Sequence, residues 1–241
     1  MITGIDFVSL PAADMARAKA FYQDVLGLEP GNALDEKWVE FDLGEGPALA
    51  LIDPAAFGMP MVPVTAGTVT IGFRDFEGMV ETLRSQGRLA KDPFESPVCH
   101  GAFALDTEGN NLAIHRRKGE PDRDRVLDFV ALPVADMARA RAFYEGLLGL
   151  TPETVHEQVW TEYVLPDDSA LALGDVSVMG LEFAPVIAGS VGLRTPEIER
   201  LFDQLKAKGH ASAEAIYETP VCFMGFVKDS EGNALVLHRH K

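Results

Sequence analysis

An internal repeat is the feature of this sequence that most constrains its fold. Residues 5–28, IDFVSLPAADMARAKAFYQDVLGL, match residues 127–150, LDFVALPVADMARARAFYEGLLGL, at an offset of 122. Near the ends of the two halves, DTEGNNLAIHRRK at 106–118 returns as DSEGNALVLHRHK at 229–241. A chain with an internal sequence repeat of this length is expected to fold as two copies of one structural unit. We therefore predict domains at 1–118 and 126–241, joined by a polar linker at 119–125.

Each half divides again into two similar modules. Strand-like alternation at 4–12 is followed by a helical pattern that Asp14 can cap, and Gly27 stands where a helix C-cap needs positive φ. Three strand-like runs complete the module, and the same order starts again at residue 68. In the second half, Thr195 is predicted to cap a helix that has Pro196 at its first position. The chain thus predicts an α+β fold of four βαβββ modules.

Composition narrows the functional classes. The chain has 241 residues, 47% of them hydrophobic, and a formal net charge of −16, which disfavours nucleic acid and anionic membranes as partners. Charged residues interrupt the first twenty positions, and no apolar run reaches membrane-spanning length, so we expect a soluble, cytoplasmic protein. Cys99 and Cys222 have neither disulfide-framework nor zinc-site spacing and are expected to be buried thiols without a nucleophilic role.

Three motifs together resemble the vicinal oxygen chelate superfamily. They are DFVxLPxxDMxRAxxFY…LGL, the segment with W…E…ALAL, and the closing DxEGNxLxxH. This superfamily includes glyoxalase I, extradiol dioxygenases, fosfomycin-resistance proteins and bleomycin-resistance binding proteins. The resemblance covers nearly the whole chain and implies tandem domains whose four βαβββ modules form U-shaped mixed sheets. It leaves the function open, because this fold hosts isomerases, dioxygenases, transferases and pure binding proteins.

The resemblance also implies positions for a divalent metal ion. Metal-dependent members place His, Gln or Glu in the first and last strands of each module, so that several donors meet on one ion. The matching residues here are Phe7, Ala50, Thr70, Ala113, Phe129, Ala172, Ser190 and Val236. None is a usual metal ligand, although the hydroxyls of Thr70 and Ser190 are weak substitutes. Ser190 lies in a strand that looks two residues shorter than its counterpart. We therefore expect no family-type metal and no cofactor.

The remaining candidates are residues that could contact an organic ligand. His115 and His238 each lie two residues beyond a metal position, and the two-residue period of a strand places them on the same face as Ala113 and Val236. Trp38 and Trp160 repeat with an acid two residues later, which fits either an aromatic wall for a cationic ligand or one face of an edge strand. The full set of predicted ligand contacts is Phe7, Trp38, Thr70, His100, His115, Phe129, Trp160 and His238.

Two functional hypotheses follow. The first is a metal-independent protein that binds a small organic molecule in two concave pockets, one per half. The second is a glyoxalase- or dioxygenase-type enzyme that uses a displaced metal site drawn from His100, His115 and His238, or metal-free acid–base chemistry on His100 or His115. A further alternative is that one half binds and the other serves as a scaffold. The sequence leaves open the catalytic residues, the ligand's identity, and whether the protein is a monomer or a homodimer.

Overall fold

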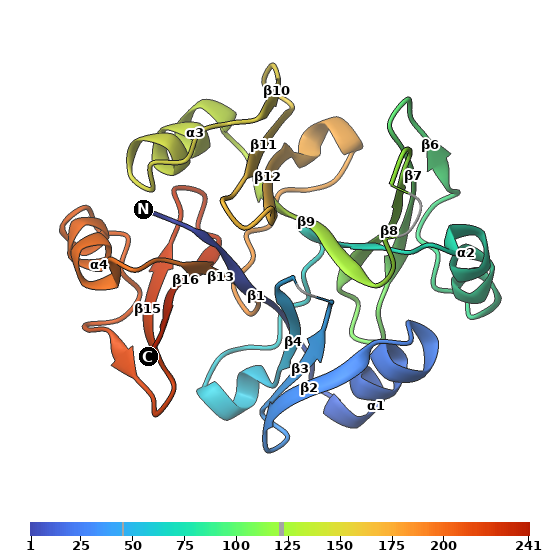
Figure 1. Cartoon of the computed structure of the whole chain (residues 1–241), viewed down its shortest axis with the longest axis horizontal. Helices are drawn as coiled ribbons and strands as arrows, with labels where there is room; N and C mark the ends of the chain where they lie inside the picture. The colour runs from blue at the N-terminus through green and yellow to red at the C-terminus, as the bar shows by residue number, and fades with distance from the viewer. Residues whose placement is uncertain (45, 121–122) are drawn as a thin grey trace.

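The computed structural model describes residues 1–44, 46–120 and 123–241, and it confirms four successive βαβββ modules (Figure 1). Two residues of the predicted linker, 121 and 122, lie outside the described residues. The elements of the first module are β1 (Gly4–Pro11), α1 (Met15–Ala20) with a π-helical turn (Phe21–Val25), β2 (Glu29–Leu34), β3 (Trp38–Asp42), β4 (Ala48–Ile52) and a 3-10 turn (Pro54–Phe57). Those of the second are β5 (Thr68–Gly72), α2 (Phe76–Ser85), β6 (Phe94–Glu95), β7 (Cys99–Leu105) and β8 (Asn111–Arg117).

The second half repeats this order. The third module contains β9 (Val126–Val134), α3 (Met137–Gly146), β10 (Thr154–His156), β11 (Trp160–Val164), β12 (Ala170–Asp175) and a 3-10 turn (Val176–Met179). The fourth contains β13 (Ser190–Arg194), α4 (Ile198–Ala207), β14 (Tyr217–Glu218), β15 (Cys222–Lys228) and β16 (Ala234–His240).

The two sheets each combine one module from each half. The first sheet has the strand order β14-β15-β16-β13-β1-β4-β3-β2, and the second has β10-β11-β12-β9-β5-β8-β7-β6. In Figure 1 the blue strand β1 accordingly lies beside the red strands of the C-terminal module. The prediction of one pocket per half was therefore wrong. The first strand of every module needs a second partner at its free edge, and here β1 pairs with β13 and β9 pairs with β5.

The hydrophobic core lies between the sheets and helices α1, α2, α3 and α4, which stand at the outside of the molecule in Figure 1. Strand residues alternate, so one set faces the helices and the other faces the opposite side. In β1, Ile5, Val8 and Leu10 belong to the core, whereas Phe7 and Ser9 point the other way. We call the side of each sheet away from the helices its inner face, and all of the predicted ligand contacts except His100 lie on this face.

The DxEGN turn does more than close a hairpin. The Asp106 carboxylate accepts the backbone N–H groups of Glu108 (2.8 Å) and Asn110 (2.9 Å), and Gly109 has φ of +88°. Asp106 is fully buried and also accepts the hydroxyl of Tyr22 in the first module, at 2.9 Å. Burial raises the pKa of the Asp106 carboxyl, although these hydrogen bonds oppose the rise. The turn thus joins the two modules of one half.

The glutamate of the same turn holds the start of the neighbouring module's helix. Glu108 pairs with Arg17 at 2.6 Å and accepts the two backbone N–H groups that precede α1. Glu231 repeats this arrangement with Arg139 at 2.7 Å and the two N–H groups that precede α3. Both glutamate side chains are almost fully buried, at 2% and 0% exposure. These clamps therefore join the two modules within each half, while the sheets join one half to the other.

Several local predictions are resolved by the structure. Asp14 caps α1 by accepting the backbone N–H of Arg17, and Gly27 has φ of +67°, as expected. Thr195 does not cap α4; the helix begins later, with Glu197 at the cap, and the Thr195 hydroxyl instead accepts the N–H of Glu197. Both cysteines are free thiols; Cys222 is buried as predicted and Cys99 is half-buried. Within the described residues, every helix is too short or too polar to cross a bilayer.

Candidate functional site

A row of aromatic rings and a histidine crosses the inner face of each sheet. In the first sheet, the Phe7 ring meets the Trp38 ring edge-on at 5.2 Å between centroids and the His238 ring at 5.5 Å. In the second sheet, the Phe129 ring meets Trp160 at 5.7 Å and His115 at 5.8 Å. The edge-to-face geometry is a favourable arrangement for aromatic pairs. Six of the eight predicted ligand contacts thus form two equivalent rows.

Strand register explains why the phenylalanines occupy the middle of these rows. Phe7 is paired with Gly192 on β13, and a Cβ at Gly192 would lie 2.5 Å from the Phe7 ring. Because Gly192 has no side chain, the Phe7 ring can lie over it. In the second sheet Phe129 has the same pairing register, but its partner Thr70 carries a side chain. The counterpart of Thr70 is thus Gly192 and not Ser190, because β13 follows the register of β5 rather than the shorter strand read from its sequence.

The positions where the superfamily places metal ligands hold side chains that do not fit a metal ion. In the first sheet Gly192 is paired with Val236, beside Phe7, and in the second Thr70 is paired with Ala113, beside Phe129. Ala50 and Ala172, the remaining two positions, are fully buried methyl groups. Thr70 offers only a hydroxyl, which is buried and has no hydrogen-bond partner among the described residues. One weak oxygen donor beside an aromatic ring cannot hold a divalent ion.

Each row ends in a buried aspartate–histidine pair. Asp6 accepts a hydrogen bond from Nδ1 of His238 at 2.5 Å, and Asp128 accepts one from Nδ1 of His115 at 2.7 Å. Both aspartates lie at β-bulges, in β1 between Ile5 and Phe7 and in β9 where the pairing with β5 shifts. A bulge turns an extra side chain toward one face, which explains why an aspartate and the phenylalanine after it both point to the inner face. Each pair also joins the two halves of the chain.

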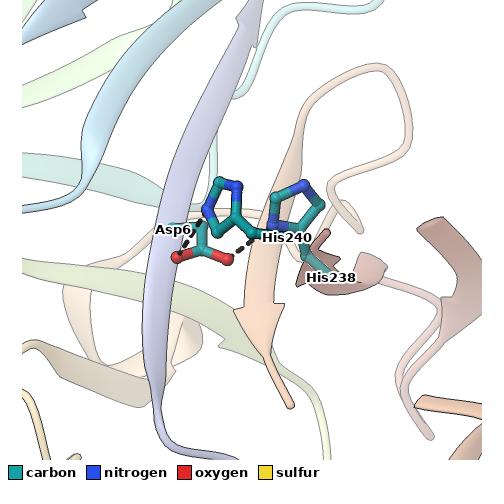
Figure 2. Close-up of side chains that lie close together, drawn as sticks. All are labelled: Asp6, His238 and His240. Atoms are coloured by element: carbon teal, nitrogen blue, oxygen red, sulfur yellow. Dashed lines mark hydrogen bonds and ion pairs between the residues drawn. The ribbon is translucent and has the colours of Figure 1, made fainter. Parts of the chain in front are cut away.

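The pair in the first sheet lies in a group of charged and titratable side chains. Arg194 contacts Asp6 at 2.6 Å and Asp167 at 2.9 Å, so one guanidinium is shared by two carboxylates. Burial raises the pKa of the Asp6 carboxyl, but hydrogen bonds from His238 and Arg194 outweigh burial and hold it below its ordinary value. Nε2 of His240 lies 3.6 Å from the same carboxylate, and Figure 2 shows both imidazoles beside Asp6.

The pair in the second sheet has different neighbours. Gly72 takes the place that Arg194 holds in the first sheet, and a Cβ there would lie 2.8 Å from the Asp128 carboxylate. Positive charge comes instead from Arg117 and Arg123, whose nitrogens lie 3.6 and 3.3 Å from Asp128. The side chains of this group pack against one another and leave essentially no room for a water-sized molecule between them.

The structure separates His100 from the other predicted contacts. His100 is paired with Arg116 across β7 and β8 and lies against Phe76 of α2, on the helix side of the sheet. His115 is paired with Gly101 and faces the other way, in phase with Ala113 as the strand period predicted. A joint His100/His115 site therefore does not form. Successive residues of β7 point to opposite faces, and the register between β7 and β8 places His100 on the face opposite to His115. The sequence alone does not give this register.

Four further residues of these rows were not among the predicted ligand contacts: Asp6, Asp128, Arg194 and His240. The signal for the two aspartates is present, because Asp-Phe recurs in IDFV and LDFV, and a charge inside an apolar strand needs a buried partner. The partner could not be identified from the sequence. His238 lies 232 positions from Asp6 and on the other half of the chain.

The paired-module sheets and their inner faces define the class of protein. The model of the Glyoxalase/Bleomycin resistance protein/Dioxygenase superfamily matches residues 4–114 and 126–237, and the chain belongs to this superfamily. It is similar in fold to glyoxalase I from Zea mays, with a TM-score of 0.63 and 20% identity over 98% of this chain and 92% of that one. A provisionally assigned dioxygenase from Bacillus subtilis gives a TM-score of 0.69 and 13% identity over 98% and 85%. No curated protein matches in sequence.

Proposed function

We propose that this protein binds a small organic molecule on the inner faces of its two sheets, without a metal ion at the superfamily's usual position. The observation that supports it is the pair of rows Trp38–Phe7–His238 and Trp160–Phe129–His115. Apolar surface with a few oriented polar groups is what capture of a small molecule requires. A phenylalanine at the position of a metal ligand removes Lewis acidity and supplies a flat apolar contact instead.

The rows indicate the chemical class of the ligand. Both tryptophans are half-buried, so their rings are partly accessible at the outer end of each row. The Trp38 indole N–H donates to Glu40 at 2.8 Å, which leaves the ring as an apolar face next to a carboxylate. Such a surface favours a ligand with a flat, conjugated portion and tolerates positive charge on it. The net charge of −16 also favours a ligand that carries positive charge.

Intrinsic fluorescence tests this proposal directly, because Trp38 and Trp160 are the two tryptophans of the chain. A panel of flat cationic, neutral and anionic compounds should contain binders that change the emission and raise the melting temperature. Trp38→Phe and Trp160→Phe each leave one reporter, so each variant should report binding on one sheet. Binding without any change of emission in either variant would place the ligand elsewhere and contradict the proposal. Metal analysis after dialysis should find no ion bound at the superfamily's metal positions, where this chain has Phe7 and Phe129.

A second function, metal-free acid–base catalysis, is supported by the aspartate–histidine pairs. In each pair Nδ1 is engaged by the carboxylate, so Nε2 is the ring nitrogen available to a ligand. An aspartate that orients an imidazole in this way is a common device for proton transfer. The relevant reaction would be removal of a proton from carbon next to a carbonyl group.

Deuterium exchange separates this function from binding alone. The protein would be incubated in D₂O with α-hydroxycarbonyl compounds, and deuterium at the acidic carbon followed by NMR. Catalysis requires that His115→Ala or His238→Ala lowers the exchange, whereas His100→Ala, on the helix side of its sheet, leaves it unchanged. Equal exchange in all these variants and in protein-free buffer would exclude the catalytic role.

A further inference from the structure

The two inner faces differ in one respect that has chemical consequences. In the first sheet Asp6, His238 and His240 bring three donor atoms within 4.8 Å of one another (Figure 2). In the second sheet Asp128 and His115 recur, but the residue cross-strand from Cys99 is Arg117, whereas the residue cross-strand from the equivalent Cys222 is His240. At these three equivalent positions one sheet therefore presents two imidazoles and a carboxylate, and the other presents one imidazole, a carboxylate and a guanidinium.

We propose that Asp6, His238 and His240 form a binding site for one divalent transition-metal ion, with Zn²⁺ as the expected type. This site is distinct from the superfamily positions, which hold Phe7, Ala50, Gly192 and Val236 in this sheet. It goes beyond the proposed ligand binding and shares only His238 with the row of the first sheet, because the rings of Phe7 and Trp38 are not donors.

The donor set and its spacing suit such an ion. Imidazole and carboxylate together are ordinary ligands for zinc, which binds them at about 2.0–2.2 Å and so holds neighbouring donors roughly 3.3–3.5 Å apart. Oδ2 of Asp6 lies 2.5 Å from Nδ1 of His238, Oδ1 of Asp6 lies 3.6 Å from Nε2 of His240, and the three candidate ligand atoms lie within 4.8 Å of one another. His238 and His240 are two residues apart on β16 and therefore point to the same face. Small side-chain rotations would admit the ion in place of the Asp6–His238 hydrogen bond.

Burial and charge also support the site. The side chains of Asp6 and His238 are 8% and 7% exposed, whereas His240 is 67% exposed. Two donors are thus fixed by packing, and the third leaves a route for the ion from solvent. Arg194 opposes a cation here, but it is shared between Asp6 and Asp167, so two carboxylates offset one guanidinium. Arg194 is held on Oδ1 of Asp6, the oxygen that also contacts His240, so Oδ2 and the two imidazoles would supply three ligands and leave the fourth position to water.

Cobalt titration tests the proposal on tag-free, chelator-treated protein. Co²⁺ should bind with a stoichiometry of one per chain and give the visible absorption of a low-coordinate site, and Zn²⁺ should displace it. His240→Arg reproduces the arrangement of the second sheet and should abolish the absorption. Loss of a direct ligand should weaken binding by more than the roughly 10–100-fold that follows loss of an outer partner. Because His240 is exposed at the end of β16, its replacement should leave the melting temperature of the metal-free protein unchanged.

Two further variants keep the result unambiguous. His100→Ala removes a histidine from the helix side of the second sheet and should retain full cobalt binding. Arg117→His installs the missing histidine in the second sheet and should raise the stoichiometry toward two per chain. Saturable binding that survives His240→Arg, or no saturable binding by the unmodified protein, would overturn the proposal. Neither outcome bears on ligand capture by the aromatic rows, which the fluorescence of Trp38 and Trp160 reports separately.

Discussion

Removal of the Glu231 carboxylate should destabilise the fold far more than removal of an equally well-formed surface ion pair. Glu231 accepts two hydrogen bonds from Arg139, at 2.7 and 2.8 Å, and two from the backbone N–H groups of Ala135 and Asp136, at 2.9 and 3.2 Å. Its side chain is fully buried. Glu231→Ala therefore leaves two backbone donors and a guanidinium without their acceptor, at the start of α3.

The size of the effect follows from these contacts. An unsatisfied buried donor costs about 1–3 kcal/mol, and the lower figure applies here because Ala135 and Asp136 are themselves exposed. Arg139 is 53% exposed, so its lost ion pair adds roughly 1 kcal/mol or less. We expect a total of about 2–3 kcal/mol. For a chain of this length that corresponds to a fall in melting temperature of about 4–12 °C.

Glu199→Ala is the matched control. Glu199 forms a similar two-point pair with Arg239, at 2.6 and 2.7 Å, but its side chain is 60% exposed. An exposed pair contributes roughly 0–1 kcal/mol, so the control should melt within about 4 °C of the unmodified protein. Both variants would be measured by urea denaturation and by thermal melting followed by circular dichroism. Equal losses in the two variants would refute the view that the DxEGN glutamate is a clamp between modules.

Three other predictions concern the phenylalanine rows and the acid stability of the clamps. Phe7→Ala removes a buried ring from above Gly192 and should lower the free energy of unfolding by about 3 kcal/mol in urea, whereas Phe7→Leu should cost less than half as much. Gly192→Ala should be destabilising alone but nearly neutral in the Phe7→Ala background, and additive losses would contradict the contact between them. Burial raises the pKa of Glu108 and Glu231, but hydrogen bonds from arginine and backbone N–H groups outweigh it and bring both below the ordinary 4.5. Their stabilisation is thus present above pH 4.5 and lost as pH falls through the lowered pKa values, so Glu108→Gln and Glu231→Gln should flatten stability against pH in acid.

Much of the candidate site follows from patterns within short stretches of sequence. The repeat identifies two halves, the order of strand and helix patterns divides each half into two modules, and the two-residue period of a strand correctly places His115 in phase with Ala113. The same period could not place His100 relative to His115, because they lie on different strands whose register is set by the hairpin between them. The alignment of Ser190 failed for a related reason. The length of an apolar run does not fix which residue pairs with Phe7.

The sequence by itself determined the module order, the duplication and the loss of the superfamily's metal ligands, because each depends on local periodicity or on the identity of single side chains. Tertiary structure alone decided that β1 pairs with β13 and β9 with β5, so that each inner face is shared by both halves. It also decided that Asp6 meets His238, 232 positions away. An apolar strand edge can pair with any equivalent edge in a fourfold repeat, and the choice among them depends on how all four modules pack at once.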